Sequence, residues 1–122
     1  VLCFWSRRND PNVLFIKFEE MKHDLPSIIR KTAAFLGKSL TDSQVDKLCD
    51  HLSFKNMKAN RAVNLDAILE KSYGKSYLEQ TKLRFIRKGE IGDWKNYMSD
   101  DLSRNFDHWA EQHLKGTGLS FE

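Results

Sequence analysis

The segment Phe85-Ile86-Arg87-Lys88-Gly89-Glu90-Ile91-Gly92-Asp93-Trp94-Lys95-Asn96 decides how the rest of the chain is interpreted. Two adjacent cations precede a glycine, and a second glycine follows three residues later, ahead of an acid, an indole and a lysine. Glycine lets the backbone bend and bring its N–H groups close to a ligand, while arginine can bind phosphate oxygens through two parallel hydrogen bonds. The pattern indicates an anion-binding loop with Trp94 packed beneath it, although a solvated basic turn would have the same composition.

The composition fits one small globular domain. The chain has 122 residues, of which 40% are hydrophobic and 11% aromatic, enough for a packed core. Its net charge of +3 suits a small anionic ligand better than a long nucleic-acid track. Cys3 and Cys49 have no motif spacing, so we expect two reduced thiols of a cytoplasmic protein, and they form no metal site with the four scattered histidines.

The run Val13-Leu14-Phe15-Ile16-Lys17-Phe18 is rich in β-branched and aromatic residues and hardly alternates with polar ones. This is typical of a strand that is buried on both faces of a parallel sheet. No second strand is evident downstream, so the hydrogen-bond partners of this strand would have to come from a part of the protein outside these 122 residues. The sequence therefore predicts the C-terminal part of a larger α/β domain, with an acidic turn at Glu19-Glu20-Met21-Lys22 after the strand.

Helix signals occupy most of the remaining chain. Asp24 is a predicted N-cap for a helix that ends at Gly37, and Thr41 with Gln44 forms a predicted capping box for the next helix. Ser99 is the predicted N-cap of the last helix. Between them we expect a short helix near 63–69 and a loop over Ser72–Tyr77. The predicted apolar stripe of the first helix is Leu25, Ile28, Ile29, Thr32, Phe35 and Leu36.

Two segments resemble the cytosolic sulfotransferases. In that family Arg-Lys-Gly, two variable residues and Gly-Asp-Trp-Lys-Asn form the C-terminal signature that binds 3'-phosphoadenylyl sulfate (PAPS), as at Arg87–Asn96 here. The family segment Thr-Ser-Phe-x-x-Met-Lys-x-Asn is matched at Ser53–Asn60, with Leu52 in place of the threonine. The closing residues Gly118–Phe121 are also similar, so the resemblance covers essentially residues 1–122 as the C-terminal part of one P-loop-like sulfotransferase domain.

The resemblance implies a set of nucleotide-binding residues. Phe54 and Met57 would contact the base, although a Phe and a Met at this spacing are also typical of core. Phe18 is a weaker candidate, because many family members have a tyrosine there. The full predicted nucleotide-binding set is Ser53, Phe54, Met57, Phe85, Ile86, Arg87, Lys88 and Gly89.

The same resemblance implies a transfer of a sulfuryl group from PAPS to a phenol, alcohol or amine. The family's phosphosulfate loop and catalytic histidine have no match here, so we expect nucleotide binding without catalytic residues. His108 and His113 are expected to be surface residues. The family's dimer motif is degenerate between Lys95 and Arg104, which argues against that homodimer.

Two alternatives remain open from the sequence. One is a small basic helical module that binds nucleic acid, although Trp5, Trp94 and Trp109 lie in unrelated elements and do not interleave with one basic groove. The other is a nucleotide-binding pseudoenzyme whose complete chain has lost the catalytic histidine. We expect no nucleic-acid partner, no membrane segment, and poor folding of this chain with exposed apolar surface.

Overall fold

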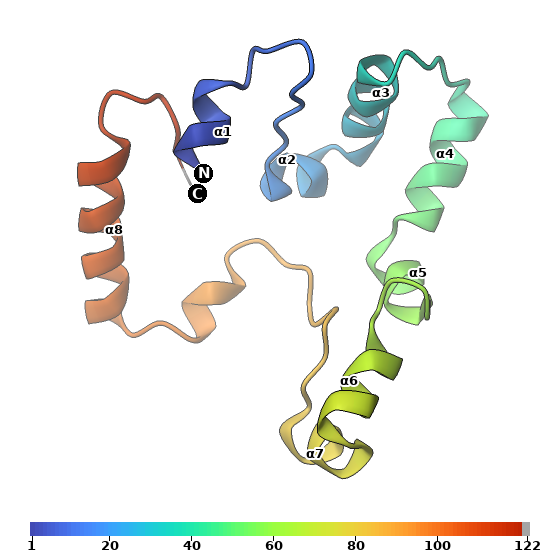
Figure 1. Ribbon diagram of the computed structural model, residues 1–122, viewed down its shortest axis with the longest axis vertical. Helices are drawn as coiled ribbons and strands as arrows, with labels where there is room; N and C mark the ends of the chain where they lie inside the picture. The colour runs from blue at the N-terminus through green and yellow to red at the C-terminus, as the bar shows by residue number, and fades with distance from the viewer. Residues whose placement is uncertain (121–122) are drawn as a thin grey trace. The chain divides into compact units, whose positions relative to one another are not determined.

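The computed structural model describes residues 1–120 and is mostly helical (Figure 1). It divides into two compact units. One comprises Val1–Ile28 with the described residues from Glu90 on, and the other comprises Ile29–Gly89. Within the described residues, no helix has both the length and the apolar character needed to span a bilayer.

The predicted strand over Val13–Phe18 is wrong. Residues 13–17 are irregular and half-buried, Phe18 is already the first residue of helix α2 (Phe18–His23), and the described residues contain no strand. A strand is defined by hydrogen bonds to a neighbouring strand, and nothing in residues 1–120 offers such a partner. The acidic turn that was expected at Glu19–Lys22 is also helical, with Glu19 and Glu20 favourably placed in the first turn of α2.

Trp5 organises the first unit. It lies in α1 (Leu2–Ser6), packs edge to face on Phe15 with ring centroids 5.1 Å apart, and donates a hydrogen bond from Nε1 to the carbonyl of Thr117 at 2.8 Å. Arg8 covers the same indole at 4.2 Å. Lys17 Nζ donates to the Ser120 carbonyl at 2.9 Å, so these two side-chain bonds tie Thr117 and Ser120 to the first residues of the chain.

The remaining elements of this unit are the 3-10 helix η1 (Asp93–Asn96) and the long helix α8 (Asp100–Leu114). The predicted N-cap of α8 is confirmed, because Ser99 Oγ accepts from the Leu102 N–H at 3.3 Å. Leu102, Phe106 and Trp109 of α8 are each about half exposed. Among the described residues of this unit, Leu119 is the hydrophobic residue that is buried.

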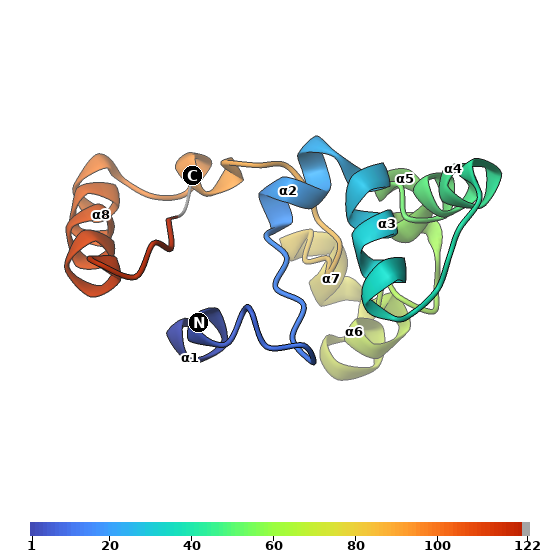
Figure 2. The ribbon, with the colours of Figure 1, turned by 90° about the horizontal axis from the view of Figure 1, so that it is seen from above.

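The second unit starts within α3 (Leu25–Phe35) and continues into α4 (Asp42–His51), which lies next to α3 in Figure 2. Arg30 and Asp42 form an ion pair at 2.8 Å between these helices. The capping box at Thr41 is confirmed, and Val45 of α4, at 1% exposure, is the most deeply buried side chain. The predicted stripe of α3 is correct for Ile29, which is buried with Ala33, but Phe35 and Leu36 are exposed.

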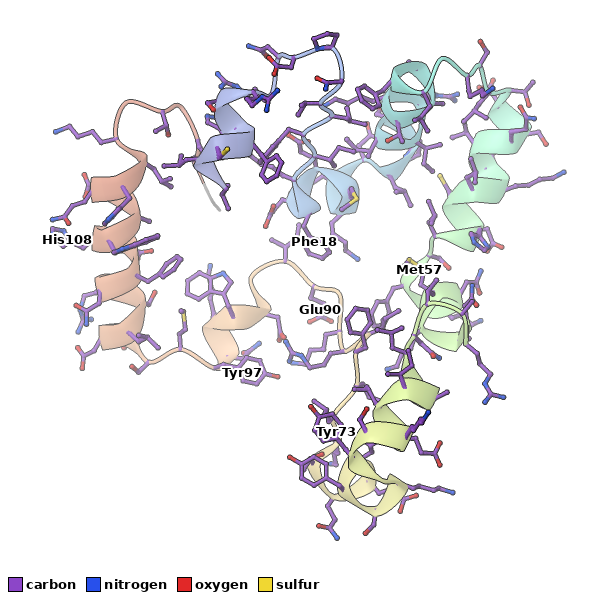
Figure 3. The ribbon with its side chains drawn as sticks, viewed as in Figure 1. Phe18, Met57, Tyr73, Glu90, Tyr97 and His108 are labelled. Carbon is purple, nitrogen blue, oxygen red and sulfur yellow. The ribbon has the colours of Figure 1, made fainter. Side chains whose placement is uncertain are left out.

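Three short helices complete this unit: α5 (Phe54–Ala59), α6 (Asp66–Tyr73) and α7 (Lys75–Thr81). Helix α5 packs on α4 and α6 packs on α7. The loop that was predicted over Ser72–Tyr77 is wrong, because only Gly74 is non-helical there. Gly74 has a φ of +82°, which lets the chain reverse within one residue, and Tyr73 then stacks on Tyr77 at 5.7 Å (Figure 3).

Candidate functional site

Helix α5 carries three of the predicted nucleotide-binding residues. Ser53 is its N-cap, with Oγ accepting from the Asn56 N–H at 3.3 Å, so this hydroxyl has a structural role. Phe54 and Met57 (the latter labelled in Figure 3) follow at a spacing of three, which places both half-buried side chains on one face of the helix. Asn56 Nδ2 donates to the Asp50 carbonyl at 2.7 Å and holds α5 on the end of α4.

Gly89 lies directly against the ring of Phe54. A Cβ added to Gly89 would be 2.6 Å from Cδ2 and 2.9 Å from Cε2 of Phe54, closer than carbon atoms approach without a clash. The φ of Gly89 is +64°, a backbone conformation that favours glycine. The contact brings together the two segments that carry the predicted site, so the absence of a side chain at position 89 is required by the packing as well as by the backbone.

The chain from Phe85 to Lys88 is irregular and follows α7. Arg84 anchors its start, because Nη1 donates to the carbonyls of Leu83 at 2.7 Å and of the buried Leu78 at 3.3 Å. Ile86 is half-buried, and Arg87 and Lys88 are exposed. The ring of Phe85 is 62% exposed, so Phe85 is not packed into the unit as Phe54 is.

Lys58 was not among the predicted site residues. Its Nζ lies 5.6 Å from the centroid of the Phe54 ring, within the range of a cation–π contact. The sequence contained a signal for it, because residues four apart on a helix share a face. With Arg87 and Lys88, Lys58 gives this unit three cations in or beside the predicted site.

The second half of the signature forms η1 in the other unit. Gly92 is its N-cap with a φ of +74°, and Asp93 is buried and accepts from Asn96 Nδ2 at 3.0 Å. Trp94 is 39% exposed, and Lys95 Nζ lies 5.5 Å from the centroid of its indole ring. These contacts hold the turn by local hydrogen bonding and packing.

A cavity of about 610 Å³ lies in the first unit, along α8. Its walls are largely apolar, and its charged lining residues are one acid of α2, two acids of α8 and a lysine. None of the predicted nucleotide-binding residues lines it. The lining residues are Glu19, Trp94, Met98, Phe106, Asp107, Ala110, Glu111, Leu114, Lys115, Leu119 and Ser120.

The histidines of α8 are surface residues, as predicted. His108 lies on an exposed face of the helix with Nε2 2.9 Å from Gln112 Nε2 (Figure 3), and His113 Nδ1 lies 2.7 Å from the Trp109 carbonyl. Across residues 1–120, no three or more His, Cys, Asp or Glu side chains are grouped so that they could hold a metal ion. Cys3 and Cys49 are free thiols.

Comparison with known proteins decides the family. The profile of the Sulfotransferase domain matches residues 1–118. The chain belongs to the sulfotransferase family. It is 43% identical over 122 residues to luciferin sulfotransferase of Photinus pyralis, and this match covers 100% of the chain and 33% of the relative. Sulfotransferase 1E1 of Bos taurus is 36% identical over 118 residues, which is 97% of the chain and 38% of that protein.

Solved sulfotransferase structures match the fold. Retinol dehydratase in a complex with retinol and PAP aligns with a TM-score of 0.85 at 36% identity, covering 98% of this chain and 33% of that one. Mouse sulfotransferase SULT7A1 complexed with PAP aligns with a TM-score of 0.74 at 32% identity, covering 94% of this chain and 39% of that one. The chain therefore spans about a third of the length of the sulfotransferases that it matches.

Proposed function

We propose that this sulfotransferase chain binds the donor nucleotide for the transfer of a sulfuryl group from PAPS to a hydroxyl or amine of a small acceptor. The observation that carries the proposal is the contact between Gly89 and Phe54, which joins the two segments that resemble the family's nucleotide site. Two of the matched structures are complexes with PAP, which supports an adenosine phosphate as the ligand here.

The residues fit such a ligand chemically. Phe54 and Met57 offer an aromatic and a polarizable apolar surface to a purine base, and base–aromatic stacking contributes about 1–3 kcal/mol. Arg87, Lys88 and the Gly89 N–H offer donors to the ribose phosphate, each charge-assisted hydrogen bond contributing about 1.5–3 kcal/mol. Ser53, Phe85 and Ile86 complete the proposed site. The nucleotide would supply the sulfuryl group, and we assign no catalytic residue to this chain.

The acceptor class rests on the relatives. Their names and titles include luciferin, amine, retinol and androsterone, all small molecules. We propose a small phenol, alcohol or amine as the acceptor of the complete enzyme, and a parallel-sheet α/β domain of which residues 1–122 form the C-terminal part. Cytoplasmic localisation and the absence of the homodimer that uses the family motif remain predictions, the second because of the sequence between Lys95 and Arg104.

Titration calorimetry of the 122-residue chain tests the nucleotide proposal. We expect binding of 3',5'-phosphoadenosine phosphate that is tighter than binding of adenosine 5'-phosphate, because only the former carries the 3'-phosphate on the ribose that we assign to Arg87 and Lys88. A single-stranded RNA oligonucleotide serves as the competitor. Tighter binding of the RNA would favour the nucleic-acid module, and no binding of phosphoadenosine phosphate would overturn the proposal.

A further inference from the structure

Asn64 is a buried polar residue, and both ends of its side-chain amide are hydrogen-bonded. It is 6% exposed, its Nδ2 donates to the Lys58 carbonyl at 3.0 Å, and its Oδ1 accepts from the Asp66 N–H at 3.1 Å. Its own backbone N–H donates to the Asn60 carbonyl at 2.9 Å. A buried amide with both ends satisfied fixes the geometry of the groups that it bonds, because leaving either end unpaired would be costly.

The two side-chain bonds of Asn64 stabilise the ends of two helices. The Lys58 carbonyl is in the last turn of α5, where no N–H of the same helix follows that could donate to it. Helix α6 begins after Leu65, which has a φ of +55° and provides no side-chain cap, so Asn64 Oδ1 supplies the missing cap to the Asp66 N–H. One side chain therefore joins the end of α5 to the start of α6.

Helix α5 needs such external support. With six residues it is too short to be stable by its own hydrogen bonds. Ser53 and Asn56 hold its N-terminal half, and Asn64 holds its C-terminal half. The face of α5 that bears Phe54 and Met57 keeps its position only if both the N-terminal half and the C-terminal half of the helix are held in place.

We propose that Asn64 is a positioning residue, which keeps the Phe54 ring against Gly89 and, on the strength of the proposed function, presents it to the nucleotide base. Asn64 acts through the Lys58 carbonyl and touches no ligand itself. This role goes beyond the residues that resemble the family's nucleotide site.

Two substitutions isolate the bond to Lys58. Asn64→Asp keeps an oxygen that accepts from the Asp66 N–H but replaces the donor to Lys58 with a second acceptor. Asn64→Ser also leaves an acceptor for the cap, and its hydroxyl is shorter than the amide that reaches Lys58. Asn60→Asp is the matched control, since Asn60 lies in the same turn and its side chain only accepts, from the Ala62 N–H at 3.0 Å.

The first measurement is the proton NMR spectrum of Gly89 without ligand. Because Gly89 lies against an aromatic ring, its Hα resonances are expected to be displaced from random-coil values by the ring current of Phe54. We expect both Asn64 variants to lose most of this displacement, while Asn60→Asp and the methyl resonances of the buried Val45 keep their wild-type shifts. A Gly89 displacement that survives in a variant with native Val45 shifts would overturn the proposal. Variants that both lose the Val45 shifts would overturn it too, because Asn64 would then support the whole unit.

The second measurement is a pair of double-mutant cycles on the affinity for phosphoadenosine phosphate. Asn64→Asp is expected to weaken binding about tenfold in the wild type and in Arg87→Ala, but less than about threefold in Phe54→Leu, since residues that act through one contact are not additive. An equal loss in all three backgrounds would indicate general destabilisation and overturn the positioning role. If the wild type binds no nucleotide, the proposed function fails, and the Gly89 resonances still decide what Asn64 does.

Discussion

Gly89 and Phe54 are in contact across a long stretch of sequence, and the contact leaves no room for a side chain at position 89. The glycine would be required there even if no ligand bound, because its φ is +64° and the ring occupies the place of a Cβ. Packing therefore favours glycine at this position, as the close approach of a nucleotide would under the proposed function. Substitution of Gly89 and of a second glycine can separate the cost of the left-handed backbone from the cost of displacing the Phe54 ring.

Gly89→Ala is expected to be more destabilising than Gly37→Ala. Gly37 has nearly the same φ, +67°, and open space where a Cβ would be. Each alanine pays about 1–2 kcal/mol for a left-handed backbone, but only the alanine at position 89 also displaces Phe54. Urea denaturation of both variants measures the difference. Equal losses of unfolding free energy would mean that the ring moves away without cost.

Phe54→Leu is expected to weaken binding of phosphoadenosine phosphate about 5- to 150-fold, since base stacking contributes about 1–3 kcal/mol. Phe106→Leu is the control, because Phe106 is a half-exposed phenylalanine of α8 in the other unit. Calorimetry of both variants measures the affinities. An affinity of Phe54→Leu within twofold of the wild type would show that the ring does not contact the base.

Arg87→Ala is expected to weaken binding of phosphoadenosine phosphate about 10- to 150-fold, which corresponds to one charged hydrogen-bonding group of about 1.5–3 kcal/mol. Binding of adenosine 5'-phosphate should change much less, because that nucleotide lacks the 3'-phosphate on the ribose. Arg61→Ala, at another exposed arginine of the same unit, controls for net charge. The same loss of affinity for both nucleotides would place Arg87 away from the 3'-phosphate on the ribose.

Val45→Ala is expected to lower the unfolding free energy by about 2 kcal/mol, because it removes buried methyl groups and leaves a cavity. Val45 is 1% exposed and Val63 is 37% exposed, so Val63→Ala is the matched control with a smaller loss. Thermal and urea unfolding check both. A cooperative transition here would also contradict our sequence-based expectation that the chain folds poorly, and the absence of one would confirm it.

Asp24 is expected to make stability depend on pH at the start of α3. Hydrogen bonds from the side chain and the backbone N–H of Ser27 lower the pKa of Asp24 below 3.8. A depressed pKa means that the stabilisation is present above pH 3.8 and is lost as the pH falls through the lower pKa of the folded state. Comparing urea midpoints of the wild type and Asp24→Asn from pH 6 down to about pH 2 measures this contribution. Parallel curves would show that Asp24 contributes nothing.

The described residues expose much apolar surface. Phe4, Leu36 and Phe85 are each more than 60% exposed, while the buried hydrophobic residues are Ile29, Ala33, Val45, Leu78 and Leu119. The predicted strand is absent from the described residues. The residues 13–17 have strand composition, but strand formation depends on a neighbour that residues 1–120 do not provide.

The sequence by itself determined the features that depend on residues within one helical turn. The caps at Asp24, Thr41 and Ser99 were predicted correctly because each joins groups three residues apart. The family was also evident from the order of residues in the signature. The sequence did not predict that Gly74 separates two helices, because a segment of this composition can form two short helices around one glycine as readily as a loop.

Only the tertiary structure decided how distant segments meet. The contact of Gly89 with Phe54, the approach of Lys58 to that ring, and the bond of Asn64 to the end of α5 all depend on where the chain returns after α7 and how it turns after α5. Local propensity fixes the conformation of a turn of helix, whereas such contacts follow from packing over the whole unit. For this reason the sequence named candidate residues of the proposed nucleotide site but not Asn64, whose side chain bonds to the end of α5.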